Sequence, residues 1–288
     1  MQGRRARTTS ENDEQERRAR TTSKNDEQER RARTTSKNDE EEADVAGGED
    51  LTGAGANPGT DPVSQWEVAR QRVRALVTGL DEEQVQRHVP ACPDWTVRDL
   101  LSHVVGLPVD VLDGDEPEDH DPAWTQAHVD RRRGRSVAEL VAEWDDVAPR
   151  LVAWMGEHGS RPLNDVVIHE QDLRGAVGEP GGRDTPGLAE VRRRMAGRLA
   201  DAVADLPPIA LVDPAPEGWR WCSHGGDGGV DPDDAPVRLE ASGFDLFRAL
   251  TSRRTADQLR SWTVRGEITP YLDAFAGLGD LPTEPLPE

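Results

Sequence analysis

Cysteine, lysine and long apolar runs are scarce in this chain of 288 residues, and each scarcity excludes a class of protein. The two cysteines, Cys92 and Cys222, cannot form a disulfide framework, so we expect a protein of the reducing cytoplasm. No run of about 18 apolar residues occurs, which predicts that no helix spans a membrane. No apolar stretch follows the first residues, so no signal peptide is expected. Only Lys24 and Lys37 are lysines, a bias typical of a GC-rich coding sequence.

Acidic residues exceed basic ones, and the formal net charge is −21. A charge of this sign argues against nucleic acid or an anionic membrane surface as a partner. Residues 1–42 contain equal numbers of acidic and basic side chains, so the excess of acid belongs to the rest of the chain.

Residues 4–42 are three copies of a 13-residue unit, beginning with RRARTTSENDEQE. The unit contains no aliphatic residue larger than alanine and cannot bury a core. Residues 43–62 continue as a glycine-rich linker. We therefore predict that residues 1–62 form a disordered tail and linker, with an interaction arm as the alternative.

Residues 63–205 are predicted to be all helical, because their apolar residues recur at helical spacing. The expected helices run over Ser64–Leu80, Thr96–Val105, Ser136–His158 and Arg161–Gly178, and from Thr185 to about Val203. Ser64, Thr96 and Ser136 are the expected N-caps of the first three, and Asn164 of the fourth. Residues 106–135 are mixed, with at most a short helix.

Residues 206–288 are predicted to form a smaller α+β unit after Leu206-Pro207-Pro208. Short strands are expected at Ile209–Val212, Trp219–Cys222, Val237–Ala241 and Trp262–Arg265, and helices at Phe244–Thr251 and Pro270–Phe275.

Asp165 and His169 lie four residues apart on the helix Arg161–Gly178, so their side chains share one face. His103 lies at the edge of the apolar face of Thr96–Val105. If the two helices are neighbours in a bundle, these three residues could hold a divalent metal and leave a fourth position open.

Other interpretations stay open at this point. Asp165 could simply favour the helix dipole, and His103 could be a histidine at the boundary of the core. Rival ligands are Glu170, Asp172, the sequence Asp119-His120-Asp121 and Cys92, although a lone cysteine is more often only packed.

Two phrases, CPDWTVRDLLSHVVG and VVIHEQDLRGAVGEP, resemble the mycothiol-dependent maleylpyruvate isomerase family of actinobacteria. That family belongs to the DinB-like metal-binding four-helix bundles. The stretches ASGFDLFRALTSRRTADQL and SWTVRGEITPYLDAFAGLG resemble its C-terminal domain, which is similar to sterol-carrier-protein folds. The resemblance covers about residues 64–285.

The resemblance implies a zinc ion held by His103, Asp165 and His169, with the thiol of mycothiol as the cofactor. The best-known members of the family have Glu where this chain has Asp165, which is one methylene shorter. A coordinated thiol loses its proton near neutral pH, and its thiolate could isomerise an electron-poor alkene or act in S-transfer to a small electrophile. Arg253 or Arg254 could bind a carboxylate of substrate or cofactor. The alternatives are a non-catalytic metal- or ligand-binding module, and a helical interaction protein without metal.

Overall fold

A computed structural model describes residues 60–117, 121–226 and 228–288 of the chain. The described residues belong to one unit, Ala56–Glu288. The predicted repeats and almost all of the predicted linker lie outside them, as do Asp119 and His120.

Four long helices form a bundle, in which α4 and α7 each contact α2 or α6 and one another. They are α2 (Pro62–Thr78), α4 (Val97–Asp113), α6 (Val137–His158) and α7 (Pro162–Val177). Their inner faces bury Leu101, Leu151 and Leu163, and the rings of Trp66 and Trp144 meet edge to face. Burial of these large apolar side chains is the main force that holds the helices together.

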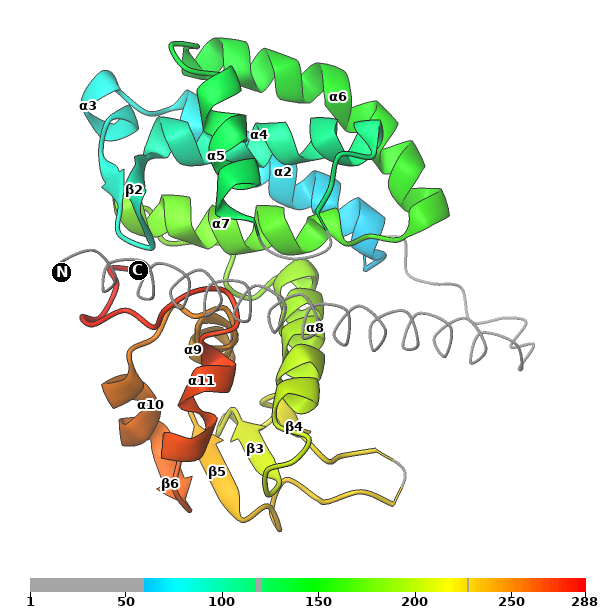
Figure 1. Ribbon diagram of the computed structural model, residues 1–288, viewed down its shortest axis with the longest axis vertical. Helices are drawn as coiled ribbons and strands as arrows, with labels where there is room; N and C mark the ends of the chain where they lie inside the picture. The colour runs from blue at the N-terminus through cyan, green and yellow to red at the C-terminus, as the bar shows by residue number, and fades with distance from the viewer. Residues whose placement is uncertain (1–59, 118–120, 227) are drawn as a thin grey trace, which may run out of the picture. The chain divides into compact units, whose positions relative to one another are not determined.

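Shorter elements complete the bundle (Figure 1). They are α3 (Glu82–Val85), the strands β1 (His88–Val89) and β2 (Cys92–Thr96), and α5 (Pro122–Arg131). The strands β1 and β2 pair antiparallel, so the phrase CPDWT is extended and leads directly into α4. The helix α8 (Pro186–Ala202) follows α7 and contacts both α2 and α7.

Three predicted helix limits are wrong. Asp61 caps α2 in place of Ser64, because Pro62 suits the first helical position. α7 likewise begins at Pro162, and Asn164 lies inside it and accepts a hydrogen bond from Arg194. α4 continues eight residues beyond Val105, through Pro108, because burial of this segment outweighs the helix-breaking tendency of proline.

The remaining caps agree with the prediction. Thr96 and Ser136 form capping boxes at the starts of α4 and α6, and Thr185 caps α8. Each satisfies a backbone N–H group that has no partner within its helix.

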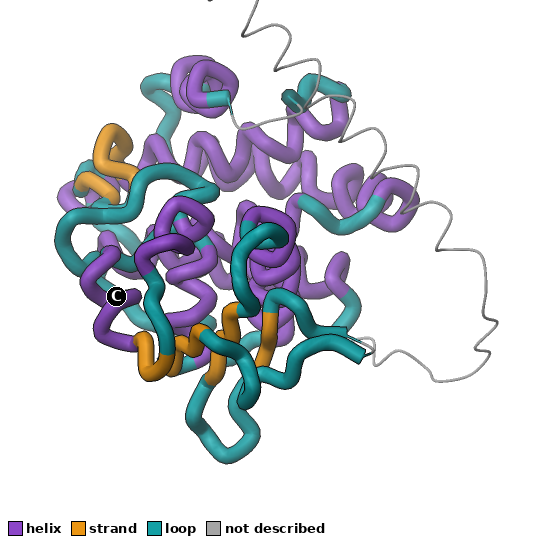
Figure 2. The backbone as a smooth tube through the Cα atoms, turned by 60° about the horizontal axis from the view of Figure 1, so that its bottom comes forward, coloured by secondary structure: helices purple, strands orange, loops and turns teal. Residues whose placement is uncertain are grey.

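A four-stranded sheet lies in residues 206–288, in the order β4-β3-β5-β6. Its strands are β3 (Ile209–Val212), β4 (Arg220–Cys222), β5 (Val237–Glu240) and β6 (Thr263–Arg265). β3 and β5 are parallel, with Leu211 opposite Leu239, and the other pairs are antiparallel. Figure 2 shows this sheet and the β1–β2 pair as two separate groups of strands.

The helices of this region are α9 (Gly243–Leu250), α10 (Ala256–Trp262) and α11 (Leu272–Phe275), with the 3-10 turn η1 (Thr269–Tyr271). α10 was not predicted. α8 contacts α9, and one hydrophobic core contains Leu199 of α8, Ile209 of β3 and Phe247 of α9. The predicted fold class, a helical bundle followed by a small α+β region, is confirmed, whereas a domain boundary at residues 205–206 stays a prediction.

Among the described helices, none is both long and apolar enough to cross a bilayer.

Candidate metal centre

His103 of α4 meets Asp165 and His169 of α7 at one point, as the sequence predicted. One potential ligand atom of each lies within 4.8 Å of those of the other two. The Nε2 atoms of His103 and His169 lie 3.1 Å and 3.3 Å from Oδ1 of Asp165. Ligands of a tetrahedral zinc ion with bonds near 2.0 Å are separated by about 3.3 Å. The donor set and spacing therefore fit a zinc-sized ion, and the shorter side chain of Asp165 reaches this point.

The neighbours of Asp165 and His169 shift the pKa values of these two groups. Burial raises the pKa of Asp165, but the charges and hydrogen bonds of His103 and His169 outweigh burial and hold that pKa well below its usual range. Burial lowers the pKa of His169, whereas the carboxylates of Asp165 and Asp172 raise it well above its ordinary value. A deprotonated carboxylate held between two imidazoles is also an arrangement that can bind a metal cation.

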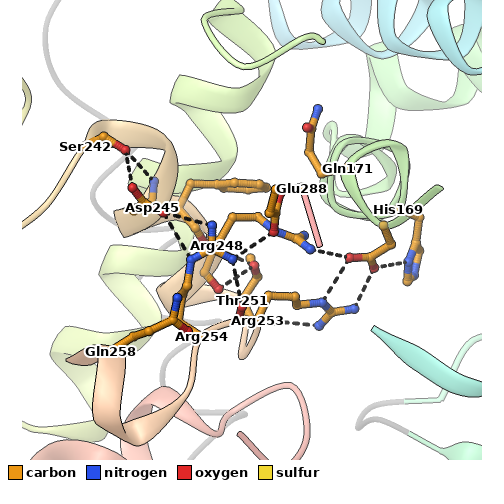
Figure 3. Close-up of polar contacts among 12 residues, drawn as sticks. His169, Gln171, Ser242, Asp245, Arg248, Thr251, Arg253, Arg254, Gln258 and Glu288 are labelled. Carbon is orange, nitrogen blue, oxygen red and sulfur yellow. Dashed lines mark hydrogen bonds and ion pairs between the residues drawn. The ribbon is translucent and has the colours of Figure 1, made fainter. Parts of the chain in front are cut away.

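Asp172 holds His169 from the other side, through a contact of 3.0 Å between its Oδ2 and Nδ1 of the imidazole. Arg253 and Arg248 lie 2.9 Å and 2.8 Å from the same carboxylate. Figure 3 shows His169, Arg248 and Arg253 converging on it. Burial raises the pKa of Asp172, but the two arginines and His169 outweigh burial and keep it well below its usual range. Asp172 therefore orients a candidate ligand, as second carboxylates commonly do at metal sites.

A second chain of polar groups reaches His103. Its Nδ1 lies 2.9 Å from Nδ1 of His128 on α5, and Nε2 of His128 lies 2.9 Å from Oδ2 of Asp110 on α4. Burial and the charge of His103 lower the pKa of His128 to about 4, so its ring is neutral at neutral pH. The sequence did not single out Asp110 or His128 as site residues, because both lie in the segment that showed no clear periodicity.

A cavity of about 640 Å³ opens beside these groups. Its wall includes His103, Asp165, His169, Cys92, Trp95 and Arg253. Arg254, the other predicted arginine, is not part of this wall among the described residues; it pairs with Asp245 and Glu288 (Figure 3). The structure thus brings Arg253, but not Arg254, to the same cavity as the three candidate ligands.

The structure also shows the contacts of the other possible ligands that lie in its described residues. Glu170 pairs with Arg72 and Arg174, on another face of α7. Asp121 caps α5. Cys92 offers its sulfur within 4.8 Å of His169 and Asp172, a second possible group that shares His169 with the first.

Residues 66–162 match the family model described as the mycothiol maleylpyruvate isomerase N-terminal domain. This segment is a domain of that family. The resemblance predicted from the sequence is therefore confirmed for it. His103 lies within the matched segment, whereas Asp165, His169 and Arg253 lie beyond its end, so the ligand set stays a prediction.

Two solved structures are similar to the chain. A crystal structure of a mutant mycothiol-dependent maleylpyruvate isomerase has a TM-score of 0.46 and 15% identity, covering 68% of this chain and 89% of that one. The crystal structure of a mycothiol-dependent maleylpyruvate isomerase has a TM-score of 0.43 and 14% identity, covering 68% and 90%. No curated protein matches the chain.

Proposed function

We propose that this protein is a metal-dependent and mycothiol-dependent isomerase or S-transferase that acts on a small electrophile. The observation that supports it best is the meeting of His103, Asp165 and His169 at the wall of a cavity. The family of residues 66–162 supports mycothiol as the thiol and an isomerisation of the maleylpyruvate type.

In this proposal His103, Asp165 and His169 hold the metal, with zinc as the metal that best suits two imidazoles and one carboxylate. When bound, zinc would lower the pKa of a coordinating thiol and supply a thiolate at neutral pH. Asp172 keeps the ring of His169 in place, and its own position is fixed by two buried arginines.

Arg253 is proposed to bind a carboxylate of the substrate or the cofactor. Its side chain is buried and lines the cavity, and its Nη1 donates to the carbonyl of Thr251, which fixes the guanidinium. The guanidinium of Arg253 also donates to Asp172, so its orientation is fixed before a ligand binds. A planar guanidinium oriented in this way suits two-point binding of a carboxylate.

The rings of Trp95 and Trp124 and the amide of Gln126 form another part of the cavity wall. Nε1 of Trp95 donates to Oε1 of Gln126 at 3.0 Å, so the indole is held in place. Apolar rings beside the candidate ligands give this part of the cavity an apolar wall, which suits a small apolar electrophile.

Metal analysis and turnover together test this proposal. Purified protein is expected to bind about one equivalent of zinc, and His103→Ala and His169→Ala are expected to lose it. Maleylpyruvate should be isomerised only when mycothiol is present. A wild-type protein that binds no metal would contradict the proposal and leave a helical interaction protein.

The second candidate is a non-catalytic metal- or small-ligand-binding module, which Asp165 favours, because its side chain is shorter than the Glu that the resemblance implies at this position. Binding of one zinc without turnover of maleylpyruvate or of a general electrophile such as a chlorodinitrobenzene, each tested with mycothiol, would support this candidate instead.

A further inference from the structure

We propose that Ser252 is a positioning residue, whose hydroxyl group holds Arg253 and residues 278–280 in place on one side of the cavity and thereby sets the affinity for a ligand carboxylate. The inference rests on the proposed function, because Arg253 is the residue proposed to bind that carboxylate. Ser252 has no role in metal binding or proton transfer in this proposal, and it acts on the ligand through Arg253.

Ser252 occupies a backbone position that normally belongs to glycine. Its φ angle is 60°, and no other residue except glycine has a positive φ in the ranges 60–117, 121–226 and 228–288 that the structure describes. The N–H of Ser252 donates to the carbonyl of Ala249 at 3.1 Å, and that of the next residue donates to Arg248 at 2.8 Å, which closes the end of α9. These two bonds form the Schellman motif, in which glycine is the usual left-handed residue. A serine in this conformation costs about 1–2 kcal/mol, so we expect a side-chain interaction that offsets the cost.

The hydroxyl of Ser252 supplies that interaction through two hydrogen bonds to the main chain. It donates to the carbonyl of Phe275 at 2.8 Å and accepts from the N–H of Leu278 at 3.0 Å. Phe275 is the last residue of α11, so its carbonyl has no partner within that helix. Ser252 is 6% exposed, so water has little access to these groups. Glycine at position 252 would fit the φ angle better but would leave both main-chain groups without this partner.

These hydrogen bonds join two segments that form one part of the cavity wall together. Ser252 and Arg253 line the cavity, and so do residues 278–280. Nη1 of Arg253 donates to the carbonyl of Thr251 at 2.6 Å, so rotation of the main chain about Ser252 would displace both the guanidinium and the carbonyl that orients it. Loss of the hydroxyl therefore leaves Arg253 charged but less well oriented for two-point binding of a carboxylate.

Ser252→Gly is the variant that tests the proposal, because it removes the hydroxyl and suits the positive φ. Ser252→Ala also removes the hydroxyl but keeps the conformational cost, so the two variants separate the hydrogen bonds from the backbone conformation. The matched control is Ser223→Gly, directly after β4. The hydroxyl of Ser223 accepts from the N–H of Ile209 at 3.1 Å, and among the described residues Ser223 is no part of the cavity wall.

The first measurement needs neither metal nor ligand. Hydrogen exchange of the backbone amides in residues 276–280 reports whether this segment is held in place. We expect exchange to be about 10-fold faster than in wild type in both Ser252 variants, because the amide of Leu278 loses its hydrogen bond. Ser223→Gly should stay within about 2-fold of wild type. Unchanged exchange in Ser252→Gly would overturn the proposal, since the hydroxyl would then hold nothing.

The second measurement is the kinetics of the protein loaded with zinc and mycothiol, with maleylpyruvate as substrate. We expect KM to rise about 5- to 20-fold in both Ser252 variants and kcat to stay within about 3-fold of wild type, because binding of the carboxylate weakens while the metal ligands are unchanged. A purely structural role would lower kcat with the amount of folded protein and leave KM unchanged. An unchanged KM in Ser252→Gly, or a rise confined to Ser252→Ala, would overturn the proposal.

Binding of maleate, a simple dicarboxylate, separates failure of this inference from failure of the proposed function. If wild type does not turn over maleylpyruvate, the proposed function fails, and the affinity for maleate, measured by isothermal titration calorimetry, decides the inference alone. Binding about 5- to 20-fold weaker in both Ser252 variants than in wild type and Ser223→Gly would support the role of Ser252. Equal affinities in all four proteins, or no binding by any of them, would overturn it.

Discussion

Asp172 of α7 and Arg253, in the connection before α10, form a buried ion pair of 2.9 Å although 81 positions separate them. The same carboxylate contacts His169, so the C-terminal α+β region acts on a candidate ligand in the helical bundle through Asp172. Arg248 adds a second guanidinium and also contacts Glu288, the last residue of the chain (Figure 3). One buried carboxylate therefore links the packing of this region to the geometry of the candidate metal centre.

Asp172→Asn is expected to lower the free energy of unfolding by about 3–5 kcal/mol, because it leaves two buried guanidinium groups without their shared acid. Urea unfolding of metal-free protein measures the change. The control is Asp257→Asn, whose ion pair with Arg260 is exposed and should contribute less than about 1 kcal/mol. Equal effects of the two substitutions would show that the buried pair contributes nothing beyond a surface pair.

Arg253→Lys and Arg254→Lys should separate the two arginines that the sequence could not tell apart. Lysine keeps the charge but loses the two-point hydrogen bonding, so we expect Arg253→Lys to lower kcat/KM about 10- to 100-fold. Arg254→Lys should change it less than about 3-fold, because Arg254 pairs with Asp245 and Glu288 away from the cavity. Steady-state kinetics with maleylpyruvate and mycothiol measure both; the reverse order of effects would contradict this role for Arg253.

The candidate ligands were predictable because local rules govern them. Asp165 and His169 share a face by helical spacing alone, whatever the rest of the fold does. His103 follows from the edge of an apolar stripe that had to face the bundle. The fold class was predictable for the same reason, since helical and alternating periodicities are properties of short windows.

The supporting residues were not predictable, because their contacts depend on packing between distant segments. Asp110, His128 and His103 meet only because α4 continues through Gly106 and Pro108, two residues that usually end a helix. The strand β2 was also missed, since it is stabilised by pairing with a two-residue partner that has no sequence pattern of its own.

Glu190 of α8 should make the fold sensitive to acid. Glu190 accepts hydrogen bonds from Arg193 and from Arg194, which lower its pKa from 4.5 to about 2 against the effect of burial. The folded pKa is below the unfolded one, so its stabilisation is complete above about pH 4.5 and is lost as the pH falls toward 2. Because the carboxylate is partly exposed and screened, we expect a loss of about 1–2 kcal/mol.

Thermal or urea unfolding of Glu190→Gln between pH 2 and 6 checks this. The variant should lose that part of the pH dependence, whereas Glu157→Gln, an exposed residue of α6, should keep it. Arg194 also donates to Ser160 and to Asn164 at the start of α7, so Glu190 helps to anchor the helix that carries Asp165. A pH profile identical in wild type and Glu190→Gln would contradict this assignment.

Gly106→Ala should destabilise the protein although alanine is the better helix former. The added methyl group would meet Nη1 of Arg132 and the Cβ and Cδ2 atoms of His128, each at 2.7 Å, so α5 must shift away from α4. Overpacking of this kind costs about 1–3 kcal/mol, which outweighs the gain of about 1 kcal/mol in helix propensity.

The matched control for this substitution is Gly197→Ala in α8, where a new Cβ would have no atom within 4 Å. At position 197 only the helix propensity changes, so we expect the free energy of unfolding, measured with urea, to rise by about 0.5–1 kcal/mol. Opposite signs at the two positions would show that close approach of His128, and not helix propensity, requires glycine at position 106. If Gly106→Ala stabilised the protein as Gly197→Ala does, α5 would not be held against α4 by this contact.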